Sequence, residues 1–310
     1  MKGRVLRSTG SWYTVKLPNA DVLECRIKGK FRLKALKLTN PIAAGDYVEV
    51  EKEAGLETAI ITKIYERNNY IIRKSPRKPG HFHIIASNID MAYLVVSLKM
   101  PQTSTGFIDR FLMVAEMYHI PATIIVNKAD LYTEKELTKW QRISHGYQQA
   151  GYKIILMSAE KAEDIEALKQ NIQHQTNLFA GQSGVGKSTL INALQPQLSI
   201  STKKVSNYSE KGMHTTTFAQ LHPISQTGYI IDTPGIKELE ATDFQAEEVS
   251  HYFPEMRERL LGCKFNNCLH KNEPKCAITK AVEDGEIAEF RYHNYINILL
   301  DKQAQNSWDI

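Results

Sequence analysis

The sequence has no long hydrophobic run and few cysteines, and each absence excludes a class of protein. Among its 310 residues, the apolar runs at 91–96 and 120–126 are far too short to span a bilayer. The first residues have no apolar core of the kind that signal peptides carry. Only four cysteines are present, three of them close together near the end, which does not resemble a disulfide framework. We therefore expect a cytoplasmic protein that has no membrane partner.

Internal repeats are also missing, low-complexity stretches are few, and 42% of the residues are hydrophobic, which is enough for a real core. The length indicates about two domains, or three small ones. The net charge of +5 is unevenly spread, because the first 80 residues hold 17 Lys and Arg against 8 Asp and Glu. A basic N-terminal module on a mildly acidic remainder suggests a polyanionic partner.

Residues 1–68 show the period of two that is typical of β-strands. Tyr13, Val15 and Leu17 alternate with polar residues, and so do Val48 and Val50 after a turn signal. A β-barrel of the oligonucleotide-binding (OB) type is one small scaffold with this pattern. Five cations at even positions lie on one face of an extended chain. They form either a phosphate-contacting surface or a merely solvated face. We assign them to RNA binding: Arg26, Lys28, Lys30, Arg32 and Lys34.

A basic segment with Pro and Gly at 73–80 is interpreted as a linker, and beyond it strands alternate with helices. This alternation predicts a parallel sheet that is covered on both faces. We expect strands at 89–96, 121–126 and 153–157, and helices at 107–118, 134–149 and 162–174. The predicted domains are residues 1–68, 80–240 and 241–310.

Residues 181–189 fit the phosphate-loop pattern G-x-x-x-x-G-K-[ST]. A short apolar strand precedes the loop and a helix follows it, as the motif requires. Glycines let backbone N–H groups approach a polyphosphate, and the helix N-terminus favours its charge. Lys187 is expected to reach the β- and γ-phosphates, and Ser188 to bind Mg²⁺. The nucleotide-binding residues predicted here are Gly181, Gln182, Ser183, Gly184, Val185, Gly186, Lys187, Ser188 and Thr189.

Asn127, Lys128 and Asp130 form an N-K-x-D motif directly after an apolar strand. A carboxylate there can accept hydrogen bonds from N1–H and N2–H₂ of guanine, whereas adenine has no donor at N1. We expect Asn127 to approach the purine N7 and the Lys128 stem to cover the base. Ser158 and Ala159 follow the next strand, where their N–H groups either reach guanine O6 or form an ordinary turn.

Two further motifs follow the phosphate loop. Among three adjacent threonines, Thr216 is our choice for completing the Mg²⁺ shell, with Thr215 close behind. An apolar strand then ends in D-x-x-G, in which Asp232 would lie on the Mg²⁺ side and the Gly235 N–H would meet the γ-phosphate. All five guanine-nucleotide motifs are thus present, but base recognition precedes the phosphate loop. A circular permutation of the GTPase domain accounts for this order.

A cluster of soft ligands lies near the C-terminus with the spacing C-x₄-C-x-H-x₅-C. Three thiolates and one imidazole suit a closed, tetrahedral structural zinc site. The predicted ligands are Cys263, Cys268, His270 and Cys276, and Cys25 is expected to be a small buried residue.

The basic β module, the rotated motif order and the Cys-Cys-His-Cys cluster together resemble the ribosome small-subunit-dependent GTPase A (RsgA, YjeQ) family across nearly the whole chain. The resemblance implies an N-terminal OB fold, a permuted α/β P-loop GTPase domain and a mainly helical zinc-binding C-terminal domain. It also implies Mg²⁺ with GTP or GDP, one structural Zn²⁺, and a cytoplasmic factor that binds the small (30S) ribosomal subunit and its 16S rRNA late in maturation. A monomer is the default expectation.

The expected reaction is attack of water on the γ-phosphorus, with Lys187, Mg²⁺ and loop amides holding the developing charge. Ile236 stands where many GTPases carry a water-orienting Gln, so we expect slow intrinsic hydrolysis that the ribosome stimulates. His214 is a candidate to position the water; otherwise it is an exposed loop histidine or an rRNA contact. Two other functions stay open: a permuted GTPase in large-subunit assembly, and an RNA-binding protein whose nucleotide site is vestigial.

Overall fold

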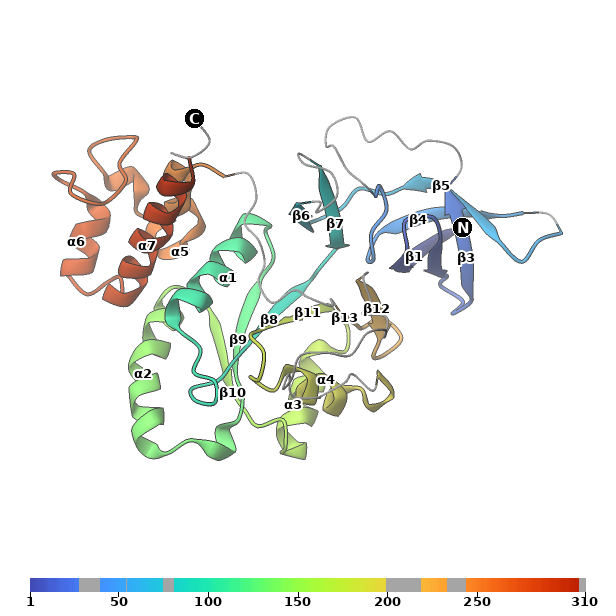
Figure 1. The fold of residues 1–310 in the computed structure, drawn as a ribbon, viewed down its shortest axis with the longest axis horizontal. Coiled ribbons are helices and arrows are strands. Elements are labelled where there is room, and N and C mark those ends of the chain that lie inside the picture. Colours follow the sequence, from blue (N-terminus) through green and yellow to red (C-terminus); the bar gives the residue numbers. More distant parts are fainter. Residues whose placement is uncertain (28–39, 54, 75–80, 199–218, 233–243, 307–310) are drawn as a thin grey trace, which may run out of the picture. The chain divides into compact units, whose positions relative to one another are not determined.

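A computed structural model describes residues 1–27, 40–53, 55–74, 81–198, 219–232 and 244–306 (Figure 1). Four of the five predicted RNA-binding cations lie outside these ranges, and so do His214, Thr215, Thr216, Gly235 and Ile236. The chain divides into two compact units. Unit 1 comprises Met1–Ala92, Ala162–Ala180 and Lys187–Thr242, and unit 2 comprises Tyr93–Lys161, Gly181–Gly186 and Asp243–Ile310. The bounds of the three predicted domains stay a prediction.

The first five strands of unit 1 form a closed barrel, which confirms the predicted OB-type fold (Figure 1). Strand β1 pairs with both β2 and β4, and β5 pairs with β3 and β4, so the ring β1-β2-β3-β5-β4 returns to β1. Apolar residues at alternate positions fill it, including Val5, Val15 and Cys25. Burial raises the pKa of the Cys25 thiol to about 12, as befits a small core residue. The strands are β1 (Lys2–Ser8), β2 (Tyr13–Lys16), β3 (Val22–Ile27), β4 (Tyr47–Lys52) and β5 (Ala59–Ile64).

The predicted linker at 73–80 is partly wrong. Strand β6 (Tyr70–Lys74) pairs antiparallel with β7 (Phe82–Ser87), so Arg73 and Lys74 are strand residues. The apolar positions of these two strands, such as Ile71 and Ile84, are buried. Basic composition alone concealed a hairpin, because its apolar residues lie on either side of the Pro- and Gly-bearing stretch.

Unit 1 also holds the strand that leads into the phosphate loop. Strand β11 (Thr176–Ala180) pairs in parallel with β13 (Tyr229–Asp232), as predicted. Strand β12 (Gln220–Pro223) runs antiparallel to β13 and also pairs with β1 of the barrel. The helices are α3 (Ala162–Ile172) and α4 (Lys187–Leu194), followed by the short helix η2 (Pro196–Leu198). Barrel and nucleotide-binding strands are thus continuous within one unit.

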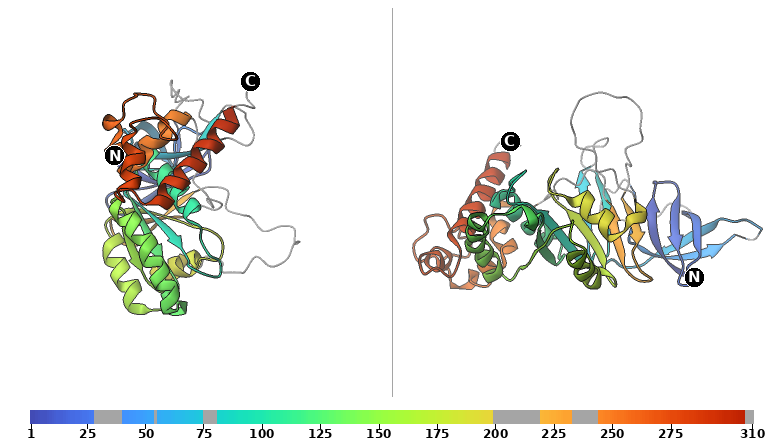
Figure 2. Two further views of the ribbon diagram at one scale, coloured as in Figure 1. Left: turned by 90° about the vertical axis from the view of Figure 1, so that its left-hand side faces the viewer. Right: turned by 90° about the horizontal axis from the view of Figure 1, so that it is seen from below.

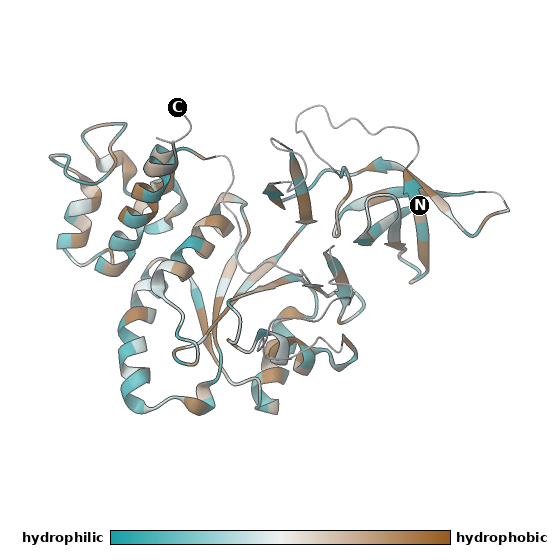
Figure 3. Ribbon diagram, in the orientation of Figure 1, coloured by the Kyte–Doolittle hydropathy of each residue, from teal (hydrophilic) through white to brown (hydrophobic). Residues whose placement is uncertain are grey.

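Unit 2 carries the base-recognition motif at the ends of its strands. Strand β9 (Ala122–Val126) pairs in parallel with β10 (Lys153–Leu156) and lies next to β8 (Met91–Val96). Helices α1 (Thr105–Met117) and α2 (Glu134–Gln149) agree with the predicted helices to within about two residues, and η1 (Ala129–Leu131) is a single turn. Figure 3 shows much of α2 as hydrophilic, consistent with a helix that faces solvent on one side.

The C-terminal part of unit 2 is helical, as expected. Helix α7 packs against α1 and the 3₁₀ helix η3, and Figure 2 shows α7 and its neighbouring helices from two further sides. The helices are η3 (Ala246–Tyr252), α5 (Pro254–Arg257), η4 (Leu260–Gly262), α6 (Ala277–Glu283) and α7 (Glu289–Asn306). In the part of the chain that the structure describes, no helix has the length and apolar character needed to cross a membrane.

Candidate nucleotide and metal sites

The phosphate loop at 181–186 depends on glycine at both of its ends. Gly181 has φ +148° and Gly186 has φ +92°, in the region that side-chain-bearing residues avoid. A Cβ at Gly181 would collide with the Val95 carbonyl oxygen, and one at Gly186 with the Asn127 amide. The loop can therefore lie this close to the neighbouring strand ends only because these positions lack side chains.

Asn127 ties the base-recognition loop to the phosphate loop. Its side chain is buried, its Nδ2 donates to the Val185 carbonyl at 3.0 Å, and its Oδ1 accepts from the Ala159 N–H at 3.0 Å. The sequence predicted proximity to the purine N7, whereas the structure shows both ends of this amide bonded to protein. Asn127 thus holds three predicted segments of the site together.

Lys128 makes a second link. Its backbone is left-handed, with φ 67°, and its Nζ donates to the carbonyls of Gly184 at 2.7 Å and Met100 at 2.6 Å. Partial burial lowers the pKa of Lys128, while Asp130 opposes that shift. These two bonds fix the ammonium of Lys128 against the phosphate loop, and its predicted packing on the base stays a prediction.

Asp130 is exposed, and one of its carboxylate oxygens accepts a hydrogen bond from Ser158 Oγ. A carboxylate has about four acceptor positions, so this bond orients the group without saturating it. The predicted pairing with guanine is therefore still open to Asp130. The N–H of Ala159 donates a hydrogen bond to Asn127 Oδ1.

The Cys-Cys-His-Cys cluster has the dimensions of a tetrahedral zinc site. The four ligand atoms lie within 4.8 Å of one another, and Cys263 Sγ is 3.6 Å from His270 Nδ1 and 4.0 Å from Cys276 Sγ. The His270 Nδ1 to Cys276 Sγ distance is 3.4 Å. Tetrahedral zinc with ordinary bond lengths separates sulfur from sulfur by about 3.8 Å and sulfur from nitrogen by about 3.6 Å. The cluster can hold a zinc ion.

Comparison with known proteins decides which family carries this combination of sites. The family model "RsgA GTPase" matches residues 64–242, and the model "RsgA N-terminal domain" matches residues 2–60. The chain belongs to the RsgA family. A small ribosomal subunit biogenesis GTPase RsgA from Bacteroides fragilis is 48% identical over 304 residues, which covers 98% of this chain and 97% of that protein. A protein of the same name from Flavobacterium psychrophilum is 48% identical over 96% of this chain and 92% of its own length.

Two solved structures share the RsgA architecture. YjeQ from Thermotoga maritima has a TM-score of 0.80 at 35% identity, covering 97% of this chain and 98% of its own. YloQ, described as a circularly permuted GTPase, has a TM-score of 0.77 at 32% identity, covering 98% and 95%. The central part of this chain is thus a permuted P-loop GTPase domain of a family that uses Mg²⁺ with GTP, as the order of the motifs indicated.

The predicted magnesium residues can be placed only in part. Ser188 lies in the first turn of α4, directly after Lys187, and both side chains are half-buried. Asp232 ends strand β13. The roles of Ser188, Thr216 and Asp232 stay predictions.

The sequence did not reveal several residues that support the two sites. Tyr132 lies two residues past the N-K-x-D motif, and its hydroxyl donates to the Asn127 carbonyl and accepts from the Leu98 N–H at 3.1 Å. Beside the cysteine cluster, the Glu273 carboxylate accepts N–H bonds from Leu269, Lys271 and Asn272. No sequence spacing marks these residues, because each acts on backbone groups that only the folded loops bring near.

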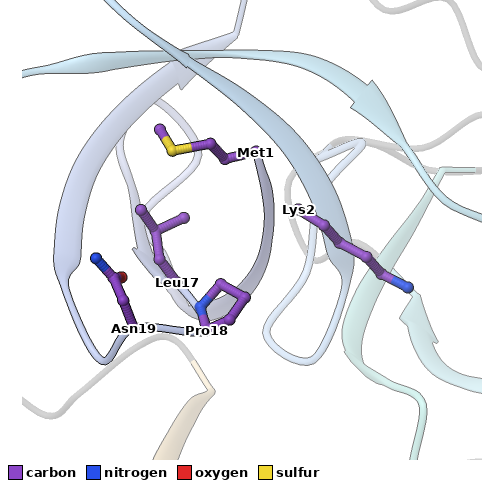
Figure 4. A pocket seen from close by; sticks show the side chains of 5 residues that line it. All are labelled: Met1, Lys2, Leu17, Pro18 and Asn19. Carbon is purple, nitrogen blue, oxygen red and sulfur yellow. The ribbon is translucent and has the colours of Figure 1, made fainter.

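The barrel surface carries a cation–ring pair and a shallow hollow. Of the predicted RNA-binding cations, the described residue Arg26 lies over the exposed Trp12 ring at 5.0 Å, an arrangement compatible with base stacking. A hollow of about 250 Å³ at one end of the barrel is lined by Met1, Lys2, Leu17, Pro18 and Asn19 (Figure 4). Figure 4 shows Lys2 extending away from Leu17 and Pro18, so its ammonium does not point into this hollow.

Proposed function

We propose that this chain is a GTP hydrolase that binds the small ribosomal subunit through 16S rRNA and assists its late maturation. It would act in the cytoplasm as a monomer, and the subunit would stimulate its GTP turnover. The main support for a GTP site is that Asn127 bonds the base-recognition loop to the phosphate loop. The small subunit is proposed as the partner because the relatives are named small ribosomal subunit biogenesis GTPases.

The proposed chemistry follows from the predicted residues. Lys187 and the loop amides would hold the γ-phosphate, and the Gly235 N–H would meet its oxygens. Mg²⁺ would be held by Ser188, Thr216 and Asp232. Ser188 would bind it through its hydroxyl, and Asp232 through an intervening water. Asp130 would read guanine, and Arg26 with its four neighbouring cations would contact rRNA phosphates.

The main test is GTP turnover alone, with purified small subunits and with purified large subunits. We expect slow turnover alone, strong stimulation by small subunits, and co-sedimentation with them that depends on the bound nucleotide. Lys187→Ala is the control that should bind subunits but not hydrolyse GTP. Stimulation by large subunits only would support the large-subunit alternative, and subunit binding without any turnover would support a vestigial nucleotide site.

His214 is proposed to position the attacking water, because the aliphatic Ile236 cannot. Single-turnover hydrolysis with saturating small subunit should fall about 10²-fold or more in His214→Ala if this group acts as a general base or orienter. If His214→Ala binds the subunit and hydrolyses GTP as fast as wild type, another group positions the water.

A further inference from the structure

Arg4 joins the barrel to the two strands that carry the phosphate-binding motifs of unit 1. It lies on β1, and its Nη2 donates to Thr176 Oγ1 at 2.6 Å and to the Asn88 carbonyl at 3.2 Å. Its guanidinium carbon is 4.9 Å from the ring centroid of Tyr47 and 4.9 Å from that of Tyr229. One side chain therefore contacts β4 of the barrel and both β11 and β13.

The two strand residues that Arg4 reaches lie opposite each other. In the parallel pairing of β11 with β13, Thr176 is the partner of Tyr229 at the beginning of both strands. Thr176 is fully buried, and its backbone exchanges two hydrogen bonds with Asp90, at 2.8 and 3.0 Å. Strand β11 continues into the phosphate loop at Gly181, and β13 ends at Asp232 of the D-x-x-G motif.

Arg4 is held by hydrogen bonds and ring contacts from several strands rather than by an ion pair. Among the described residues it makes no ion pair, and its Nε is buried without a hydrogen-bond partner. Two neutral oxygens and two ring faces hold the cation instead. A planar guanidinium can stack on rings and donate in its own plane at once, which an ammonium cannot.

We propose that Arg4 is a positioning residue that couples the partner-binding barrel to GTP turnover. A strand rises about 3.3 Å per residue, so β11 spans about 13 Å of stiff backbone from Thr176 to Ala180. A shift of β1 when the barrel binds its partner would move both strand starts together, and with them Ala180, which precedes the phosphate loop, and Asp232 at the end of β13. The inference rests on the proposed stimulation by the small subunit, and it places Arg4 outside the nucleotide site.

The test compares basal with stimulated turnover in Arg4→Ala. We expect GTP affinity, basal turnover and subunit affinity to stay within about threefold of wild type. The stimulated single-turnover rate should fall about tenfold, within the usual range of coupling between sites. Arg7→Ala is the matched control, because Arg7 lies exposed on the same strand and its loss removes the same charge.

Thr176→Val removes the acceptor while keeping the shape, so it should reproduce the loss of stimulation. The double variant with Arg4→Ala should be no worse than either single variant, because both remove one interaction. Arg4→Lys keeps the charge but should restore little coupling. If Arg4→Ala does not fold, as judged by circular dichroism, Arg4→Lys and Thr176→Val provide the same comparison.

Equal losses of basal and stimulated turnover in these variants would make Arg4 a plain structural brace and overturn the proposal. So would an equal loss of stimulation in Arg7→Ala. Absence of stimulation in wild type would instead contradict the proposed function. Hydrogen exchange then tests the link without subunits: a non-hydrolysable GTP analogue should slow exchange in β4 of wild type but not of Arg4→Ala. Equal slowing in both proteins overturns the coupling.

Discussion

Asn127 shows how one buried amide can organise a site. Its donor end and its acceptor end bond to the Val185 carbonyl and the Ala159 N–H, which lie far apart in sequence. An amide buried at this position without both partners would leave polar groups unmet, at a cost of about 1–3 kcal/mol each. Asn127 therefore stabilises the juxtaposition of loops on which Asp130 depends.

Asp130→Asn should change the preferred base from guanine to xanthine. The Asn amide would place a donor against the guanine N2–H₂ group, whereas xanthine presents a carbonyl oxygen there. Because two donors that face each other without an acceptor discriminate strongly, we expect GTP affinity to fall about 10²-fold or more while xanthosine triphosphate binds better than to wild type. Titration with fluorescent nucleotide analogues measures both affinities.

The matched control is Glu160→Gln, which makes the same chemical change at a neighbouring carboxylate on the next loop. It should leave GTP affinity nearly unaltered. Equal GTP affinity in Asp130→Asn and wild type would exclude Asp130 as the guanine reader.

At the scale of elements, a buried arginine joins three helices of unit 2. Arg291 on α7 donates to Asp109 on α1 at 2.5 Å and to Glu255 on α5 at 2.7 Å, and all three side chains are buried. Burial opposes the charge, but these two carboxylates raise the Arg291 pKa well above its ordinary value. The cluster fixes the α1, α5 and α7 helices with directional bonds rather than packing alone.

Arg291→Ala should destabilise the protein by about 3–5 kcal/mol, because it leaves two carboxylates buried without their counter-ion. Denaturant unfolding, followed by circular dichroism, measures the change. Arg257→Ala is the control: this arginine also bonds to an α1 carboxylate, Glu116, at 3.0 Å, but its side chain is about half exposed. Surface pairs contribute about 0–1 kcal/mol, so comparable losses in the two variants would contradict a special role for the buried cluster.

For the whole molecule, the zinc cluster predicts that metal and folding are linked. A strong chelator should remove about one zinc per chain and open the loop between η4 and α6, since structural zinc contributes on the order of 10 kcal/mol to small sites. Metal analysis and limited proteolysis around residues 262–277 measure both effects. Cys276→Ser should reproduce them.

Cys25→Ser is the control for metal content, because Cys25 is buried in the barrel core away from the cluster. It should retain about one zinc per chain. Loss of zinc in Cys25→Ser, or retention of it in Cys276→Ser, would show that the metal is held elsewhere.

The elements that the sequence predicted well are those with strong periodicity or a motif. Helix α2 was expected at 134–149 and is found there, because Trp140 and Tyr147 recur on one buried face while charged residues fill the other. The β6–β7 hairpin was missed, since basic residues and prolines masked a short alternation. Arg4 and Arg291 gave no signal, because a lone arginine in a strand or helix is ordinarily exposed.

The sequence alone predicted the chemistry: glycines for a phosphate loop, a carboxylate for guanine, thiolates for zinc, and the rotated order of the motifs. These follow from residue type and spacing within short segments, where local geometry decides which groups can meet. Which residues hold those segments together became visible only in the folded chain. Asn127 bonds to Val185 and Arg4 bonds to Thr176 across long stretches of chain. Such pairs come together only when strands assemble into a sheet, and a single sequence carries no periodic trace of them.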